Sequence, residues 1–139
     1  MINVSYTYEV PYVYGRGRPR PTLRLEIRSI PDPTLAIETE AELDSGAEAT
    51  IFRGDVCSAI GLDPMGGREK TFQTVMVNRT LLVARIHRVQ LVHHLLGEVE
   101  MEIAFATEDI GRNLLGLDFF NFFKIGFQDR QDRVCFERE

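Results

Sequence analysis

The chain has 139 residues with a formal net charge of −5, and 44% of its residues are hydrophobic. This length gives one domain, residues 1–139, with a single core. The acidic balance, with a pI near 5.3, argues against proteins that bind nucleic acid by neutralising its phosphates. No apolar stretch is long enough to span a membrane and no signal-peptide pattern is visible, so we expect a cytoplasmic protein that binds neither nucleic acid nor membrane.

The first 20 residues are expected to form an irregular N-terminal segment. Tyr6, Tyr8, Tyr12 and Tyr14 occupy even positions, which is the spacing of a strand, but the stretch Gly15–Pro21 is rich in Gly, Arg and Pro and ends any strand. Its arginines fit either a contact with an anionic partner or a solvated loop, and we favour the loop.

Alternation of apolar and charged side chains predicts the first strands. Residues 22–30 place Leu23, Leu25 and Ile27 on the face that we expect to be buried, and residues 35–43 alternate glutamates with inward aliphatic side chains. Further strands are expected over residues 50–52, 71–77, 80–92, 99–106, 124–128 and 133–137, and short helices over 54–60 and 118–123. About eight short strands with one or two short helices predict an all-β, closed barrel.

The stretch Glu42–Phe52 is the clearest candidate for chemistry. An aliphatic run ends at Leu43, Asp44 follows, and Ser45 and Gly46 come next. Gly46 allows a sharp bend, because it has no Cβ to clash. Ser45 can support the bend with local hydrogen bonds. The sequence therefore places a carboxylate on a tight loop between two strands.

This loop resembles the active-site loop of aspartic peptidases, in which Asp, Thr or Ser, Gly and Ala are followed by Ser or Thr three residues later. Asp44, Ser45, Gly46, Ala47 and Thr50 fit this pattern at every position. Asp-Ser-Gly alone is common in turns, so the loop by itself also fits a purely structural turn.

A second element, Asn113–Phe120, contains Leu114, Leu115 and Gly116 in succession. It resembles the hydrophobic-hydrophobic-Gly element that follows the active-site loop in the same family and precedes a short helix. The two elements, in this order and at this separation, make the chain similar to the short, retropepsin-like (retroviral-type) aspartic peptidases. The resemblance implies a closed acid-protease-type barrel.

The resemblance also implies peptide hydrolysis by two carboxylates that share a proton, because like charges this close cannot both ionise. One carboxylate activates a water and the other protonates the carbonyl oxygen. Asp109-Ile110-Gly111 is followed by Arg and Asn where small residues are required, so we interpret it as an ordinary turn. A second copy must then supply the second carboxylate, and we expect a C2 homodimer with Asp44 from each subunit at the axis.

The same resemblance assigns roles to neighbouring residues. Ser45 would bond across the axis to the partner loop, and Leu114 and Leu115 would pack beneath the loop. Gly116 would let two segments cross closely. C-terminal strands interleave between subunits in the family, which implies that some phenylalanines of residues 119–127 face the partner.

The hairpin over residues 72–83 lies between the two matched elements, where the family has a flap that closes over substrate. The flap and substrate-binding residues would be Thr74, Val75, Met76, Val77 and Asn78. Retroviral flaps are rich in glycine at the tip, whereas this tip has none, and β-branched residues stiffen the backbone. A second interpretation therefore stays open, a dimerising or peptide-binding module of the same fold with weak or no activity.

Two further positions bear on the site. Leu117 stands where many relatives carry an arginine that binds an acid just after the active-site loop. Glu48 is available as that acid, and Arg112 is a possible substitute for the arginine. Asp118 is expected to cap the short helix that follows.

No metal or other cofactor is expected. His87 lies in the strand predicted over residues 80–92, and His93 and His94 lie at its end. Adjacent histidines in a strand point to opposite faces and cannot easily bind one ion together. Cys57 and Cys135 are expected to be free and buried. A metal-dependent hydrolase is the third function class, distinguished by bound metal and by sensitivity to chelators.

The leading expectation is therefore an aspartic endopeptidase that works as a homodimer on peptide or protein substrates. The resemblance further implies a largely apolar cleft that accepts extended peptides with hydrophobic side chains near the scissile bond.

Overall fold

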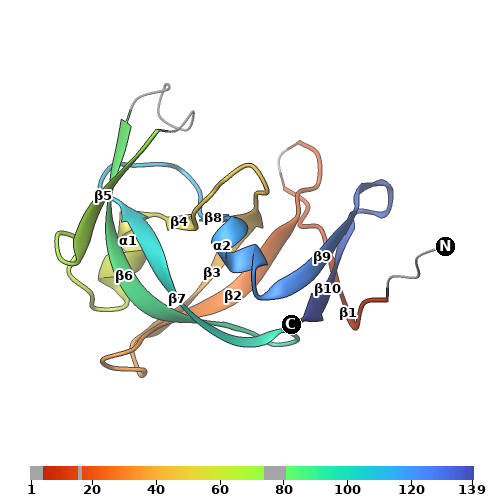
Figure 1. Cartoon of the computed structure of the whole chain (residues 1–139), viewed down its shortest axis with the longest axis horizontal. Coiled ribbons are helices and arrows are strands. Elements are labelled where there is room, and N and C mark those ends of the chain that lie inside the picture. Colours follow the sequence, from red (N-terminus) through yellow and green to blue (C-terminus); the bar gives the residue numbers. More distant parts are fainter. Residues whose placement is uncertain (1–4, 16, 74–80) are drawn as a thin grey trace.

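The computed structural model describes residues 5–15, 17–73 and 81–139 (Figure 1). Within these ranges the chain forms ten strands, two short α-helices and one 3-10 helix. The strands are β1 (Tyr8–Pro11), β2 (Thr22–Ser29), β3 (Ala36–Leu43), β4 (Ile51–Phe52), β5 (Arg68–Gln73), β6 (Leu81–His93), β7 (Gly97–Ala106), β8 (Leu114–Leu115), β9 (Phe123–Gln128) and β10 (Arg133–Arg138). The helices are α1 (Gly54–Ala59), α2 (Leu117–Phe120) and the 3-10 helix η1 (Asp129–Gln131).

Seven of these strands form one sheet in the order β2-β3-β8-β4-β7-β6-β5, and β6 also pairs with β2. Ile27 of β2 accordingly lies opposite Ile37 of β3 on one side and opposite Leu91 of β6 on the other. This additional pairing closes the sheet into a barrel, and β5 is attached along β6 (Figure 1). The predicted all-β, closed acid-protease-type fold is confirmed.

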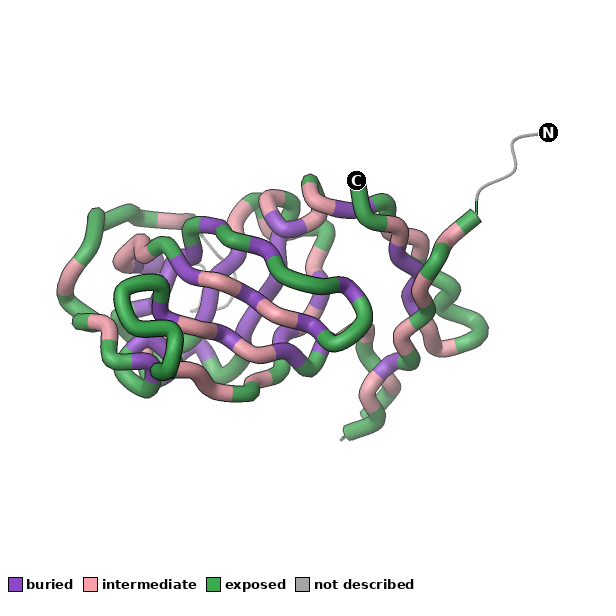
Figure 2. Tube along the Cα trace, turned by 90° about the horizontal axis from the view of Figure 1, so that it is seen from below, coloured by how far each residue is buried: buried purple, intermediate pink, exposed green. Residues whose placement is uncertain are grey.

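The barrel interior is filled by the side chains that alternate along its strands. Leu23, Leu25 and Ile27 of β2 are almost fully buried, as the alternation predicts, and the inward side chains of β7 face the same core. Figure 2 shows the buried residues alternating with half-buried and exposed ones along these strands. Ala104 and Ala106 are also buried, in a second, smaller cluster, so the end of β7 is covered on both faces.

The N-terminal segment is more ordered than its sequence predicts. β1 pairs antiparallel with β10, and β10 pairs with β9, which gives a three-stranded sheet beside the barrel (Figure 2). Tyr12 is only 3% exposed, and its N–H donates to the carbonyl of Asp132 at 2.7 Å. β1 pairs with an edge of the C-terminal hairpin. This partner lies more than a hundred residues away in the sequence, so local sequence patterns cannot predict the pairing.

This arrangement changes what we expect of a dimer. β10 is hydrogen-bonded to β1 along one edge and to β9 along the other, both within the same chain. The expected interleaving of C-terminal strands between subunits would therefore have to displace β1 from residues 133–136 of β10.

Element boundaries differ in smaller ways from the sequence pattern. Leu35 was expected to face inward but is 40% exposed, because it precedes the first residue of β3. The strand expected over residues 71–77 begins earlier, at Arg68.

None of the described helices combines the length and apolar character that crossing a bilayer requires. Cys57 and Cys135 are both free and buried, as expected.

The paired histidines do not lie as predicted. His93 is the last residue of β6 and His94 is in the turn that follows, so strand alternation does not separate them. Their ring centroids are 4.5 Å apart. His93 Nδ1 accepts the N–H groups of Leu95 and Leu96 at 3.2 and 3.3 Å, which fixes the turn between β6 and β7.

Burial, together with the charge of His94, lowers the pKa of His93 from 6.5 to about 4. The unfolded chain therefore takes up this proton at higher pH than the folded one. The stability that neutral His93 contributes is complete above pH 6.5 and is lost as the pH falls through this range toward 4.

We expect His93→Asn to flatten this acid dependence, because the Asn oxygen can accept the same turn hydrogen bonds without titrating. Thermal melts followed by circular dichroism between about pH 7 and about pH 4.5 should show a smaller fall in Tm than in the native protein. His94→Asn, at an exposed neighbouring position, should keep most of the native fall. Equal falls in the native and His93→Asn proteins would contradict this account.

Candidate active site

β3 ends at Leu43, and the chain turns immediately after Asp44. The Gly46 N–H donates to Asp44 Oδ1 at 2.8 Å, and the Ala47 N–H donates to the Asp44 carbonyl at 3.2 Å. A Cβ at Gly46 would lie 3.2 Å from the same carboxylate oxygen, so a residue without one suits this turn. The Asp44 side chain is partly exposed, and Ser45 is exposed beside it, so both functional groups are accessible from outside the barrel.

Strand β8 holds both ends of this loop. Leu115 lies opposite Leu43 in a parallel pairing with β3, and Leu114 lies opposite Ile51 in an antiparallel pairing with β4. The Asp44 N–H donates to the Leu115 carbonyl at 2.9 Å. Both leucines are buried, so the loop over residues 44–50 stands on a buried apolar base.

Gly116 is the point where two chain segments cross. A Cβ at this position would lie 2.6 Å from backbone atoms of Ala49 and 2.7 Å from the carbonyl of Ala47. These are backbone atoms that cannot move aside cheaply. The Leu117 N–H donates to the same Ala47 carbonyl at 2.8 Å, which locks the crossing. The close approach that the sequence predicts for Gly116 is thus present.

Thr50 is the centre of a hydrogen-bond network beneath the loop. Its N–H lies 3.0 and 3.1 Å from the two carboxylate oxygens of Asp118, and its hydroxyl donates to Asp118 Oδ1 at 2.7 Å. The Gly116 N–H donates to the Thr50 hydroxyl oxygen at 3.1 Å. Thr50 is 1% exposed, so these bonds are shielded from water and join the end of the loop to α2.

Asp118 was expected to cap a helix, but it is not the N-cap residue. α2 begins at Leu117 with Gly116 at the N-cap position, and within this helix the Asp118 carboxylate accepts only the N–H of Phe119 next to it, at 2.8 Å. The same carboxylate also accepts the buried Thr50 donors from a segment 68 residues earlier, a contact that was not predicted. One feature of the sequence could have suggested this contact. An acid stands two residues after Gly116, and a buried motif threonine needs a hydrogen-bond acceptor.

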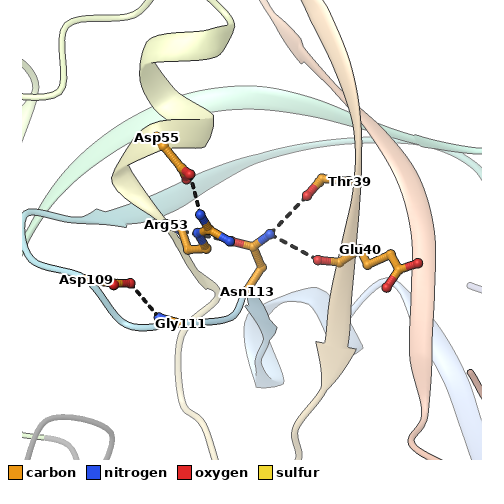
Figure 3. A network of polar contacts seen from close by, with 7 residues as sticks. All are labelled: Thr39, Glu40, Arg53, Asp55, Asp109, Gly111 and Asn113. Atoms are coloured by element: carbon orange, nitrogen blue, oxygen red, sulfur yellow. Dashed lines mark hydrogen bonds and ion pairs between the residues drawn. The ribbon is translucent and has the colours of Figure 1, made fainter. Parts of the chain in front are cut away.

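Asn113 ties together the strands on either side of the loop (Figure 3). Its Nδ2 donates to Thr39 Oγ1 at 3.1 Å and to the Glu40 carbonyl at 3.0 Å, both in β3. Its Oδ1 accepts the Arg53 N–H at 2.8 Å, just after β4. Asn113 is 6% exposed, so its amide serves as a buried clamp, a role that the sequence did not reveal.

Asp109 and Gly111 make the same side-chain hydrogen bond as Asp44 and Gly46, although their backbone conformations differ. The Gly111 N–H donates to Asp109 Oδ1 at 2.9 Å, and Gly111 has a positive φ of 76°. Asp109 therefore behaves as an ordinary turn residue, as expected. The hydrogen bond from Gly46 alone does not mark Asp44 as special; what distinguishes Asp44 is its anchoring on β8.

Arg112 does not replace the family's arginine in the way that the sequence suggested. Arg112 Nη1 lies 3.0 Å from Glu42 Oε2, so this arginine pairs with Glu42 and not with Glu48. Glu48 is exposed on the loop, and Leu117, whose N–H donates to the carbonyl of Ala47, is 42% exposed. The surface around the loop therefore combines an accessible carboxylate with an accessible apolar side chain.

The flap prediction falls on residues outside the described ranges, namely Thr74, Val75, Met76, Val77 and Asn78. β5 and β6 lead to and from that segment.

Across residues 5–15, 17–73 and 81–139, no three His, Cys, Asp or Glu side chains are grouped so that they could hold a metal ion.

We expect Asp118→Ala to destabilise the protein by about 2 kcal/mol, because it leaves two buried donors of Thr50 without an acceptor. Urea unfolding followed by fluorescence or circular dichroism measures this change. Asp109→Ala is the matched control: it removes a turn carboxylate at the surface and should cost less than about 1 kcal/mol. Similar losses in the two variants would show that Thr50 does not depend on Asp118.

The sequence matches no protein-family model and no curated protein. Solved structures do match. A retropepsin-like aspartic protease from Rickettsia conorii superposes with a TM-score of 0.65 at 17% identity, covering 92% of this chain and 98% of that one. EIAV protease in complex with the inhibitor HBY-793 superposes with a TM-score of 0.53 at 16% identity, covering 78% and 92%. The chain thus has the fold of the retropepsin-like aspartic proteases.

Proposed function

We propose that this protein is an aspartic endopeptidase that acts as a homodimer on peptide or protein substrates. The observation that carries the proposal is the position of Asp44. Its part-exposed carboxylate sits on a turn that β8 and the Thr50–Asp118 network hold from below, in a fold shared with aspartic proteases.

The chemistry requires a second carboxylate close to the first. In such a pair one member stays ionised and takes a proton from water, while the other is protonated and donates to the substrate carbonyl. The two groups titrate as one unit. The Gly46 N–H already holds one oxygen of Asp44, which leaves the other oxygen free to meet a partner.

The second carboxylate comes from a second copy of the chain. Asp109 is the other Asp-x-Gly turn, but nothing comparable to β8 anchors it and it belongs to an exposed loop. A C2 axis beside the loop over residues 44–50 brings two Asp44 side chains together. Because β10 is paired on both edges, the subunits would meet through the loop surface, including Leu117, and not through interleaved β10 strands.

Substrate would lie across the two Asp44 carboxylates as an extended peptide. The segment Val75–Asn78, between β5 and β6, would cover it as a flap. Its sequence lacks glycine, and this feature favours the second candidate function, a peptide-binding or dimerising module that does not cleave.

We expect Asp44→Asn to abolish peptide cleavage by at least about a hundredfold, because an amide cannot share the catalytic proton. Mass spectrometry of a peptide library incubated between mildly acidic and neutral pH measures cleavage. Asp109→Asn, in a turn with the same Asp-to-Gly hydrogen bond, should cleave like the native protein. Cleavage that persists in Asp44→Asn would exclude this mechanism, and a native dimer that binds peptides without cleaving them would support the module.

We further expect activity to require two intact copies of Asp44. At constant total protein, mixtures of native and Asp44→Asn chains should, after subunit exchange, lose activity as the square of the native fraction when both chains associate equally. Cleavage rates, together with light scattering to verify the dimer, measure this. A linear loss would mean that a single chain carries a complete site.

A further inference from the structure

Two guanidinium groups converge on one carboxylate beside the candidate active site. Arg112 Nη1 lies 3.0 Å from Glu42 Oε2, and Arg20 Nη1 lies 3.3 Å from the same oxygen. Both guanidinium groups are permanently charged, so one glutamate cannot neutralise them. The cluster therefore keeps one unit of positive charge, in a protein whose formal net charge is −5.

These three side chains line a hollow with a volume of about 460 Å³. Its lining carries a third arginine, Arg53, which is already paired with Asp55, and one further acid, Glu40, along with polar side chains such as Thr22. The arginine side chains are about half exposed, at 51% for Arg20 and 47% for Arg112, whereas Glu42 is 22% exposed. The two guanidinium groups are thus more accessible than the carboxylate between them.

The hollow lies on the same side of β3 as the Asp44 carboxylate. The N–H groups of Glu42 and Asp44 both donate toward β8, to the carbonyls of Asn113 and Leu115, while the Leu43 N–H between them donates to Pro21 on the opposite side. Strand alternation thus continues through Asp44, and Glu42 shares its face. Two residues along a strand span about 7 Å.

We infer that this hollow is a substrate subsite that binds an acidic side chain, Asp or Glu, near the scissile bond. The inference rests on the proposed peptidase function and names the substrate class for that same site. An extended peptide across Asp44 also advances about 3.3 Å per residue, so a side chain within two or three residues of the scissile bond reaches the hollow. Arg20 and Arg112 offer it the planar donors that match a carboxylate.

This chemistry differs from the apolar preference that the family resemblance implies. An apolar side chain in the hollow would cover half-exposed guanidinium groups and remove their water without replacing its hydrogen bonds. An acidic side chain replaces those hydrogen bonds and gives Arg20 and Arg112, which share the single carboxylate of Glu42, a second acceptor. Because the arginines are about half exposed, the preference is moderate, about fivefold for Glu over Gln.

The test is the rate of cleavage of internally quenched peptides that carry Glu, Gln or Leu at each of three positions on either side of the scissile bond. Capped termini remove the chain-terminal carboxylate as an alternative ligand, and work near pH 6 keeps a Glu side chain, of pKa about 4.3, ionised. We expect kcat/KM to favour Glu over Gln about fivefold at one position and to lose this preference as salt rises.

Two substitutions in the hollow should change the Glu to Gln ratio in opposite directions, and together they test whether the hollow is the subsite. Arg112→Gln should bring the Glu to Gln ratio close to one, whereas Glu42→Gln removes the competing internal carboxylate and should raise the ratio. A general folding defect would not move the two in opposite directions. Arg24→Gln, which removes an exposed arginine paired with Glu38 outside the hollow, should keep the native ratio.

Cleavage with no Glu preference at any position, or with the same ratio in both variants, would overturn the subsite and leave the peptidase intact. If the native protein cleaves nothing, the proposed function fails separately, and binding then decides the subsite. Fluorescence anisotropy of capped, labelled peptides with one Glu or Gln should show about fivefold tighter binding of Glu to the Asp44→Asn protein. Equal binding of the two peptides would overturn the subsite.

Discussion

The backbone pairing of β8 is the constraint on which the candidate site depends. This strand has only two residues, Leu114 and Leu115, yet it hydrogen-bonds to β3 on one side and to β4 on the other. A strand this short gains little from its own few hydrogen bonds, and its position is fixed by burial of both leucines. Asp44 therefore takes its place from a segment about seventy residues later, because the turn alone cannot fix where the carboxylate points.

Comparing the two Asp-x-Gly turns of this chain distinguishes the hydrogen bond within a turn from the position of that turn in the fold. Their hydrogen bonds are nearly identical, 2.8 Å at Asp44 and 2.9 Å at Asp109. Only the first continues a barrel strand and rests on buried donors that Asp118 satisfies. A short motif thus specifies a turn, and the surrounding barrel decides whether that turn presents a carboxylate to a partner and a substrate. This is why the second element, around Gly116, carries as much weight as the Asp loop.

Sequence periodicity predicted the parts of the fold that depend on neighbouring residues. The alternation in residues 22–30 gave β2 and its buried face. The crossing at Gly116, which joins distant segments, was implied by the family resemblance and not by periodicity. The contributions of Asp118 and Asn113 were not predicted, because their partners lie 60 or more residues away. Local rules gave Asp118 a capping role, since an acid early in a helix is a common cap. β1 was missed for the same reason: its pairing depends on the edge of a distant hairpin.

In the proposed peptidase, assembly and chemistry would be linked by the exclusion of water. In one chain Asp44 is partly exposed to solvent. A second Asp44 facing it, with substrate and flap excluding water, would leave the Gly46 N–H of each chain and one shared proton to stabilise the pair. On this argument the barrel fixes the position of each carboxylate, and association of two chains would create the electrostatic environment in which one carboxylate acts as the acid and the other as the base.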